Sequence, residues 1–294
     1  MSDEARLILF GWTGLLGLLI GSFLNVCIFR LPRNCMSVAR PRSKCPKCRT
    51  LIAWYDNIPV LSWILLGGKC RHCAVRISPR YAGVELLTAA LFLAASWRIL
   101  YGFGADLHAA DQAALFVLHA WFLSALVVST FIDLEFRILP DEITLSGILI
   151  GLVWSAAFPS ILHLGDPMRP RSWDPHLAAA GTAAFGAVVG GGSIWGVGFL
   201  GKLAFRKEAM GFGDVKFMAM VGAVLGWRGV LLTFMLACLI GSAYGITRWL
   251  FTRKMGQVPF GPFLSAGALG MLFGAEAVDR GIQAYFNLIR GLGR

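Results

Sequence analysis

A series of long apolar segments covers most of this 294-residue chain and limits the folds that it can adopt. A membrane-spanning helix needs about 20 mostly apolar residues. The segments that meet or approach this length are residues 7–29, 81–101, 112–132, 142–162, 177–201, 214–227, 228–250 and 261–287. The sequence therefore predicts an all-α polytopic membrane protein with about eight transmembrane helices.

Composition agrees with this prediction. Only 15% of the residues are charged and 57% are hydrophobic, whereas a soluble domain carries about 25% charged residues. The segment 214–227 is short, so we expect it either to begin inside the bilayer boundary or to form one bent unit with 228–250 through Gly226 and Gly229. The first segment is too long for a cleaved signal peptide and lacks an A-x-A site, so we expect it to be the first membrane helix.

The distribution of Lys and Arg predicts the orientation of these helices. The net charge of +11 raises nucleic-acid binding as an alternative. However, if the N-terminus is outside, 19 of the 27 Lys and Arg residues lie on the inner side, in segments 30–80, 133–141, 202–216 and 248–262. The positive-inside rule assigns such segments to the cytoplasm. We therefore expect both chain ends outside, membrane lipid around the helices and no nucleic-acid partner.

The predicted organisation has three parts: a first transmembrane helix at 1–29, a cytoplasmic insert at 30–80 and a transmembrane helical bundle at 81–294. The insert carries two C-x-x-C pairs, formed by Cys45, Cys48, Cys70 and Cys73. Thiolates at this spacing can complete a tetrahedral zinc site.

Other interpretations of the cysteines are weaker. Two disulfides are the main alternative, but thiols stay reduced in the cytoplasm. A redox C-x-x-C would need a βαβ context that the sequence lacks. His72 is a less favoured replacement ligand. We therefore expect a structural zinc ion held by the four cysteines.

Two aspartates lie at predicted helix ends on the cytoplasmic side. Asp133 ends the segment 112–132, where a negative charge opposes the helix dipole, so capping does not explain it. Asp214 follows Gly211-Phe212-Gly213 and opens an apolar segment, where it is an N-cap, a functional group or both. Because a carboxylate at the boundary of a membrane is costly, both residues are functional candidates.

The other acidic residues near these ends have simpler interpretations. Asp141 follows a proline and precedes an apolar run, so we expect it to be an N-cap. Glu135 and Arg137 are expected to be solvated. Glu85 lies about two turns inside the helix 81–101. The sequence leaves its role open between a carboxylate stabilised by the helix start or by an Arg, and a contact with substrate or cofactor.

Glycine and proline mark two further features. The segment 186–198 holds six glycines, but it lies in an apolar helix without a preceding strand, so it does not predict a phosphate loop. We expect these glycines to allow close helix packing. Pro259-Phe260-Gly261-Pro262 is expected to open the last helix, either as a plain helix start or as the border of a pocket. No repeat of 20–50 residues is evident.

Asp133 and Asp214 together suit aspartyl proteolysis. If the two carboxyls meet, like-charge repulsion leaves the pair sharing one proton. The ionised member can then deprotonate a water while the protonated member hydrogen-bonds the scissile carbonyl. The sequence contains no H-E-x-x-H or G-x-S-x-G motif that would support another protease mechanism.

These motifs make the chain resemble bacterial type IV prepilin peptidases, which are bifunctional prepilin leader peptidases and N-methyltransferases. The similarity runs nearly end to end. It rests on Gly21-Ser22-Phe23-Leu24-Asn25-Val26 with Arg30-Leu31-Pro32, the paired C-x-x-C, Trp54-Tyr55-Asp56-Asn57-Ile58-Pro59, Arg80-Tyr81 with Glu85-Leu86, Asp133 with Leu139-Pro140-Asp141, Gly211-Phe212-Gly213-Asp214 and Pro259-Phe260-Gly261-Pro262. The combination is specific, whereas G-x-G-D alone is not.

The resemblance implies a catalytic dyad of Asp133 and Asp214. It implies cleavage after a glycine in the short basic leader of type IV prepilins and of secretion pseudopilins, at the cytoplasmic face of the bacterial inner membrane. It also implies methylation of the new amino terminus with S-adenosylmethionine. The sequence shows no methyltransferase fold or nucleotide loop, so it does not assign the S-adenosylmethionine site.

Two alternatives to a peptidase remain open at this point. A proton-coupled transporter would also use intramembrane carboxylates, although these lie at one face and no inverted repeat is evident. A purely structural role in pilus assembly would make Asp133 and Asp214 dispensable.

Overall fold

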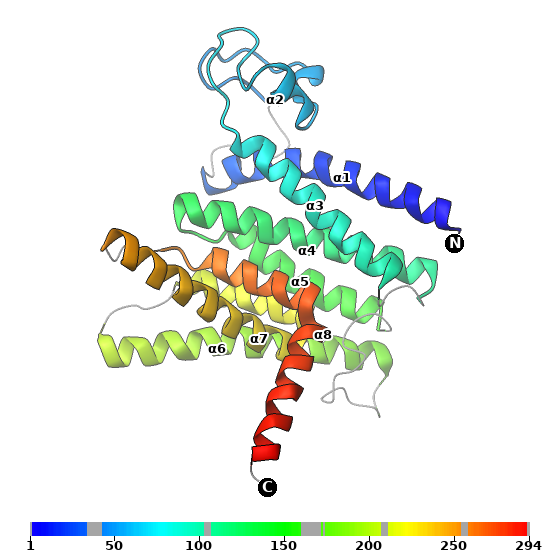
Figure 1. The fold of residues 1–294 in the computed structure, drawn as a ribbon, viewed down its shortest axis with the longest axis vertical. Coiled ribbons are helices and arrows are strands. Elements are labelled where there is room, and N and C mark those ends of the chain that lie inside the picture. The colour runs from blue at the N-terminus through cyan, green and yellow to red at the C-terminus, as the bar shows by residue number, and fades with distance from the viewer. Residues whose placement is uncertain are drawn as a thin grey trace. The chain divides into compact units, whose positions relative to one another are not determined.

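The computed structural model of this protein describes residues 2–33, 43–102, 107–159, 172, 174–206, 211–253 and 258–292. The chain forms two compact units, Met1–Pro140 and Asp141–Arg294. The described residues form eight α-helices, two short 3-10 helices and two isolated β-bridges, with no strand among them. Figure 1 shows this helical architecture, which confirms the predicted all-α class.

The first unit combines long helices with a small insert. Its elements are α1 (Asp3–Arg30), η1 (Leu31–Arg33), η2 (Trp54–Asn57), α2 (Leu61–Leu65), α3 (Arg80–Tyr101) and α4 (Ala109–Phe136). Helices α1 and α3 approach closely because α1 carries small residues there. A Cβ at Gly17 would lie 2.6 Å from Ala89 Cα, and one at Gly21 would lie 2.7 Å from Glu85 Cα. Such small residues at a four-residue spacing are typical of helix contacts in membranes.

The second unit consists of α5 (Asp141–Ala157), α6 (Pro175–Phe205), α7 (Phe212–Thr252) and α8 (Gly261–Leu292). Helix α7 is interrupted at Gly226, whose φ of 73° and ψ of 175° are non-helical. Glycine adopts such backbone angles without a steric penalty. The predicted segments 214–227 and 228–250 are therefore the two halves of one bent helix, which was one of the two alternatives that the sequence left open.

The glycines of α6 serve helix packing, as predicted. A Cβ at Gly186 would clash with the carbonyl oxygen of Gly222 in α7, and one at Gly190 would clash with that of Met218. By contrast, a Cβ at Gly196 would have no neighbour within 4 Å. Only part of the glycine-rich segment therefore enforces the close approach of α6 and α7.

Among the described residues, five helical segments are long and apolar enough to cross a membrane, namely Asp3–Arg33, Arg80–Tyr101, Ala109–Phe136, Pro175–Ala204 and Phe212–Thr252. The apolar segment Gly261–Ala275 of α8 is shorter, and α5 has 17 residues, fewer than the roughly 20 of a typical span. The chain is therefore a multi-pass membrane protein.

Candidate active site and metal centre

The four predicted metal ligands lie together in the insert. The sulfur atoms of Cys45, Cys48, Cys70 and Cys73 are all within 4.8 Å of one another, and the Sγ atoms of Cys45 and Cys73 are 3.7 Å apart. A tetrahedral site with Zn–S bonds of about 2.3 Å requires sulfur atoms about 3.8 Å apart. All four cysteines are free thiols, so the disulfide alternative is not found here. The four cysteines could hold a metal ion, and His72 is not part of this group.

Two equivalent hairpins present these ligands. In the first, the N–H of Cys45 donates to Thr50 O (3.0 Å) and the N–H of Arg49 donates to Cys45 O (2.9 Å). In the second, Cys70 and Ala74 make the corresponding bonds, because Cys70 N–H donates to the carbonyl of Val75 and Ala74 N–H to that of Cys70. Each hairpin is also closed by one antiparallel bridge.

The two hairpins share a short sequence pattern, which is too brief to stand out as a repeat in the sequence alone. Residues 43–52 read SKCPKCRTLI and residues 68–77 read GKCRHCAVRI, so the pattern K-C-x-x-C-x-x-x-I recurs 25 positions later. The residue that directly follows the second cysteine of each C-x-x-C pair has a left-handed backbone, with φ of 58° at Arg49 and 54° at Ala74. The metal centre is thus built from two copies of one local structure, which makes the four ligands converge.

Hydrogen bonds prepare two of these thiols for metal binding. The side-chain and backbone hydrogen bonds from Thr50 lower the pKa of the Cys48 thiol to about 6. Backbone hydrogen bonds from Cys73 and His72 likewise lower the pKa of Cys70. Because the thiolate is the form that binds metals, these donors favour the metal-binding form of Cys48 and Cys70, whereas the pKa of the Cys73 thiol is raised to about 11.

Asp133 lies in the last turn of α4 and is buried, with 6% of its surface exposed. Its carbonyl oxygen accepts a hydrogen bond from Arg137 N–H (2.9 Å), and Arg137 ends the helix with a left-handed φ of 57°. The helix therefore continues just past Asp133 before the chain turns toward α5. A negative charge near a helix C-terminus opposes the helix dipole, which agrees with a functional role.

Glu135 fixes the end of α4 to two other elements. Its Oε2 accepts a hydrogen bond from Arg80 Nη1 at 2.6 Å, at the start of α3. Its Oε1 lies 3.7 Å from Arg33 Nη2, in η1. Glu135 is exposed, as predicted, and ion pairs also join it to Arg80 and Arg33.

Asp214 occupies the first turn of α7. The N-cap of this helix is Gly211, and Asp214 is three residues later. Asp214 Oδ2 accepts a hydrogen bond from Gly211 N–H at 3.3 Å, so the carboxylate reaches back over the helix start as in a capping box. This position corrects the N-cap interpretation, although the favourable interaction with the helix N-terminus is retained.

Asp141 is the first residue of α5 and makes an ion pair with Lys216. Lys216 Nζ lies 2.7 Å from Asp141 Oδ1 and 2.8 Å from Oδ2. The same ammonium lies 5.0 Å from the centre of the Phe212 ring. Because Lys216 follows Asp214 by two residues, this pair links the start of α5 to the turn that carries Asp214.

Glu85 joins the insert to the membrane helices. It is buried in α3, with 8% of its surface exposed, and its Oε2 accepts a hydrogen bond from Val60 N–H at 2.7 Å. The Ser22 hydroxyl of α1 also hydrogen-bonds this carboxyl group. These contacts give the carboxylate structural partners from α1 and from the insert.

The residue that Glu85 holds has a strained backbone. Val60 has φ of 59° and ψ of −50°, and the N–H of Leu61 donates to Pro59 O across it. This is a classic γ-turn, which is rare and unfavourable, above all for a β-branched residue. A strained turn persists only where its surroundings stabilise it, and Glu85 supplies one of these contacts.

The structure therefore brings the four cysteines together, but it describes the two aspartates in separate units. Asp133 belongs to Met1–Pro140 and Asp214 to Asp141–Arg294, so their pairing stays a prediction. Sequence reasoning did not identify Lys216 and Arg80 as partners of acidic residues. In the sequence, these two residues are marked only by their closeness to motif residues. Lys216 follows Asp214 by two positions, and Arg80 precedes Glu85 by five.

Comparisons with known proteins identify two families that this chain matches. Residues 15–99 match a family described as the bacterial peptidase A24 N-terminal domain, and residues 120–246 match the type IV leader peptidase family. The first match spans the cysteine cluster and Glu85, and the second spans Asp133 and Asp214. No solved structure matches the chain significantly.

Curated relatives carry one shared description, prepilin leader peptidase/N-methyltransferase. A Myxococcus xanthus protein is 41% identical over 241 residues, which cover 82% of this chain and 63% of that protein. A Pseudomonas aeruginosa protein is 37% identical over 296 residues, covering 92% of each chain. An Aeromonas salmonicida protein is 36% identical over 287 residues, covering 88% of this chain and 89% of the relative.

Proposed function

Because this chain belongs to the prepilin leader peptidase/N-methyltransferase family, we propose that it removes the short leader peptide of type IV prepilins and pseudopilins and methylates the amino terminus that cleavage exposes. The family makes it a protease with methyltransferase activity. It does not support the proton-coupled transporter or a purely structural role.

We assign the peptidase chemistry to Asp133 and Asp214. The observation that carries this assignment is the G-x-G-D turn, which places the Asp214 carboxylate at the start of α7 within the matched peptidase region. Asp133 complements it, since it is buried near the end of α4, where a negative charge opposes the helix dipole. Both residues lie at the ends of long apolar helices, where a polar substrate backbone can reach them.

The reaction follows from two carboxyls that share one proton. The ionised carboxylate takes a proton from water while the water oxygen bonds to the scissile carbonyl carbon, and the protonated carboxyl hydrogen-bonds the carbonyl oxygen. The C–N bond of the resulting tetrahedral intermediate then breaks as the leaving nitrogen takes a proton. The leader keeps the new carboxyl end, and the mature pilin keeps the free amine that methylation modifies.

The proposal includes two further groups. A zinc ion is the metal that four thiolates at these distances favour, and it would hold the two hairpins of the insert together. S-adenosylmethionine would supply the methyl group, and its binding residues are not assigned. The peptidase site faces the cytoplasm of a bacterial inner membrane in this proposal, which the concentration of Lys and Arg in one set of loops supports.

Mass spectrometry of a prepilin tests both activities at once. A purified prepilin is incubated with the purified protein in detergent, with and without S-adenosylmethionine. We expect loss of the leader in both samples and a further gain of one methyl group only with S-adenosylmethionine. A prepilin that keeps its leader in both samples would contradict the proposed function.

The two activities are separable by substitution in the same assay. Asp214→Asn should prevent leader loss from a prepilin but still permit methylation of a pre-cleaved pilin, because the two reactions need different groups. If a folded Asp214→Asn protein loses both activities, one shared site would be indicated instead.

A further inference from the structure

One face of the insert exposes large apolar side chains. In α2, Leu61, Ile64 and Leu65 are 49%, 60% and 75% exposed, and Trp54 of the neighbouring η2 is 74% exposed. Residues of this kind normally supply the core of a small domain. The insert is joined at both ends to membrane helices, α1 and α3. Exposed apolar side chains in such an insert are typical of a surface that faces an apolar or interfacial environment.

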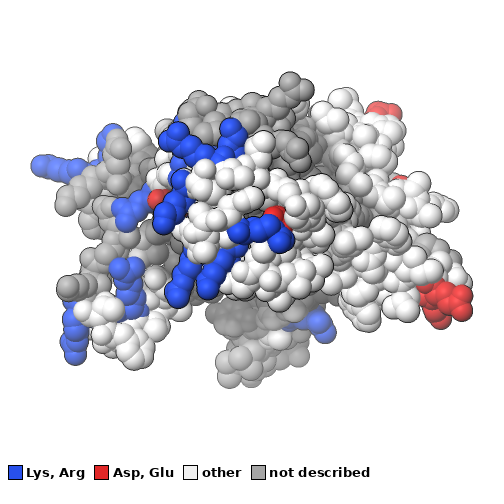
Figure 2. Space-filling model, turned by 90° about the horizontal axis from the view of Figure 1, so that it is seen from above, with Lys and Arg blue, Asp and Glu red and all other residues white. Residues whose placement is uncertain are grey.

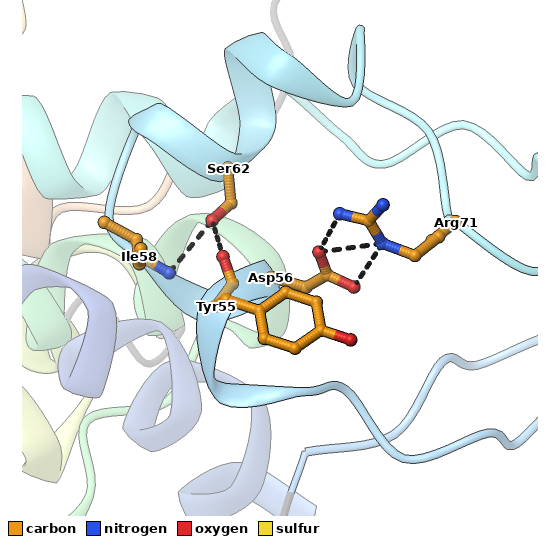
Figure 3. A network of polar contacts seen from close by, with 5 residues as sticks. All are labelled: Tyr55, Asp56, Ile58, Ser62 and Arg71. Carbon is orange, nitrogen blue, oxygen red and sulfur yellow. Dashed lines mark hydrogen bonds and ion pairs between the residues drawn. The ribbon is translucent and has the colours of Figure 1, made fainter.

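The opposite face of α2 is fixed inside the insert (Figure 3). The buried Ser62 hydroxyl accepts a hydrogen bond from Ile58 N–H at 3.0 Å and donates to Tyr55 O at 2.8 Å. Asp56 and Arg71 form a fork in which Arg71 Nε lies 3.0 and 2.9 Å from the two carboxylate oxygens. These bonds tie η2 and α2 to the second metal hairpin, so the outward direction of Leu61, Ile64 and Leu65 is set by the fold.

The contact between Val60 and Glu85 sets the depth at which α2 begins. Glu85 is five residues inside α3, so it lies about 7–8 Å along the helix from Arg80. Arg80 marks the polar end of the span, because it pairs with Glu135 at the end of α4. Since Val60 N–H binds Glu85 directly, α2 begins at the level of the membrane boundary rather than far out in the cytoplasm.

The charge of the insert matches an anionic membrane surface. Residues 43–79 contain one acidic residue, Asp56, which Arg71 already neutralises. The exposed cations of the same segment are Lys44, Lys47, Arg49, Lys69, Arg71 and Arg76. Figure 2 shows Lys and Arg side chains gathered on one face with few Asp and Glu among them. Exposed Trp, Leu and Ile beside Lys and Arg are the composition of segments that lie in the membrane interface.

We propose that η2 and α2 form an interfacial segment, seated in the headgroup region of the adjacent leaflet and bound to anionic phospholipid. Leu61, Ile64, Leu65 and Trp54 contact the boundary of the acyl chains, and the surrounding Lys and Arg contact the headgroup phosphates. The metal centre is then held at the membrane surface, next to the ends of α1 and α3. This inference needs only that the chain is a membrane protein and is independent of the proposed reaction.

Photocrosslinking of the full-length, metal-loaded protein tests this surface. p-Benzoylphenylalanine replaces Leu65 in one variant and Lys47, which is exposed on the first metal hairpin, in the control. Both are reconstituted in nanodiscs of phosphatidylcholine and phosphatidylglycerol, and metal content shows that the insert is folded. We expect severalfold more lipid adduct from position 65 than from position 47. Equal yields, no lipid adduct, or adducts only to a second copy of the chain would overturn the proposal.

The role of headgroup charge is tested in the same system. We expect the lipid adduct at position 65 to decrease severalfold in nanodiscs of phosphatidylcholine alone, because the neutral surface no longer attracts the Lys and Arg side chains. Adduct yields that are the same in neutral and anionic nanodiscs would contradict the binding of anionic phospholipid. A prepilin is then added to test whether this surface binds substrate instead of lipid. Crosslinking of position 65 to prepilin in place of lipid would also contradict the proposal.

Discussion

At the scale of single residues, the two candidate catalytic carboxylates have different supports. Asp214 is held by its own helix, because its Oδ2 accepts the Gly211 N–H at the start of α7. Asp133 is held by burial near the end of α4, whose last turn is attached to α3 by the pair of Glu135 with Arg80. One carboxylate therefore depends on local backbone geometry, and the other on contacts between helices.

Substitution of either aspartate with asparagine should abolish peptidase activity. Asn keeps the size of Asp but cannot take a proton, so we expect Asp133→Asn and Asp214→Asn each to slow prepilin cleavage by about 10²–10⁴-fold or more. The double variant should be little worse, because residues that act as a unit are not additive. Cleavage rates of purified variants in detergent measure these effects.

Asp174→Asn is a suitable control for these variants. Asp174 caps α6 by accepting the backbone N–H of His176 and Leu177, and Asn caps helices equally well. This variant should cleave prepilin normally. Normal turnover by a folded Asp133→Asn or Asp214→Asn protein would rule out the aspartyl mechanism.

Glu85 should stabilise the turn at Val60 through the hydrogen bond that it accepts from the Val60 N–H. Glu85→Ala leaves the part-buried Val60 N–H without its acceptor, at a cost below the roughly 1–3 kcal/mol of a fully buried donor, whereas Glu85→Gln retains a carbonyl oxygen. We expect faster amide hydrogen exchange over residues 54–66 in the alanine variant and nearly normal exchange in the glutamine variant. Unchanged exchange in Glu85→Ala would show that other contacts hold the strained turn.

At the scale of secondary-structure elements, close helix contacts depend on where each glycine faces. Gly190→Ala places a methyl group against the Met218 carbonyl, and overpacking of this kind costs about 1–3 kcal/mol. Gly196→Ala has free space and also improves helix propensity. Thermal unfolding in detergent should therefore show a lower midpoint for Gly190→Ala and an unchanged or higher one for Gly196→Ala. Equal midpoints would mean that α6 and α7 separate easily.

The insert should depend on its metal more than the membrane helices do. Cys48→Ser removes one of four ligands, and metal binding contributes directly to the folding of small metal sites. We expect loss of bound zinc and faster hydrogen exchange over residues 43–77, while the membrane helices keep their protection. Elemental analysis of the unaltered protein is the direct measurement, and a pure, active protein without metal would contradict a structural zinc site.

At the scale of the whole molecule, orientation in the membrane determines which side the aspartates face. Because 19 of 27 Lys and Arg residues fall in one set of loops, a reporter fused after Thr50 should be cytoplasmic and one fused between α3 and α4 should be external. Reporter activity in cells measures both positions. The opposite result at both would place Asp133 and Asp214 on the other side of the membrane.

Most of the helices and the metal ligands were predictable because they depend on local patterns. Apolar length indicates a spanning helix wherever it occurs, and two C-x-x-C pairs have few stable arrangements other than a shared metal site. The break in α7 was also predictable, since Gly226 and Gly229 lie between two apolar runs and glycine permits the required backbone angles. Each of these features is encoded by residues close together in the chain or by chemistry with few alternatives.

The partners of the acidic residues became known only from the folded chain. Glu85 binds a residue 25 positions away, Glu135 one that is 55 away and Asp141 one that is 75 away. From sequence, each carboxylate is interpreted through the helix that carries it, as a cap, a solvated group or an open question. Helix packing decides instead which distant cation or amide reaches the carboxylate, and an apolar pattern specifies that a helix forms without specifying its neighbour.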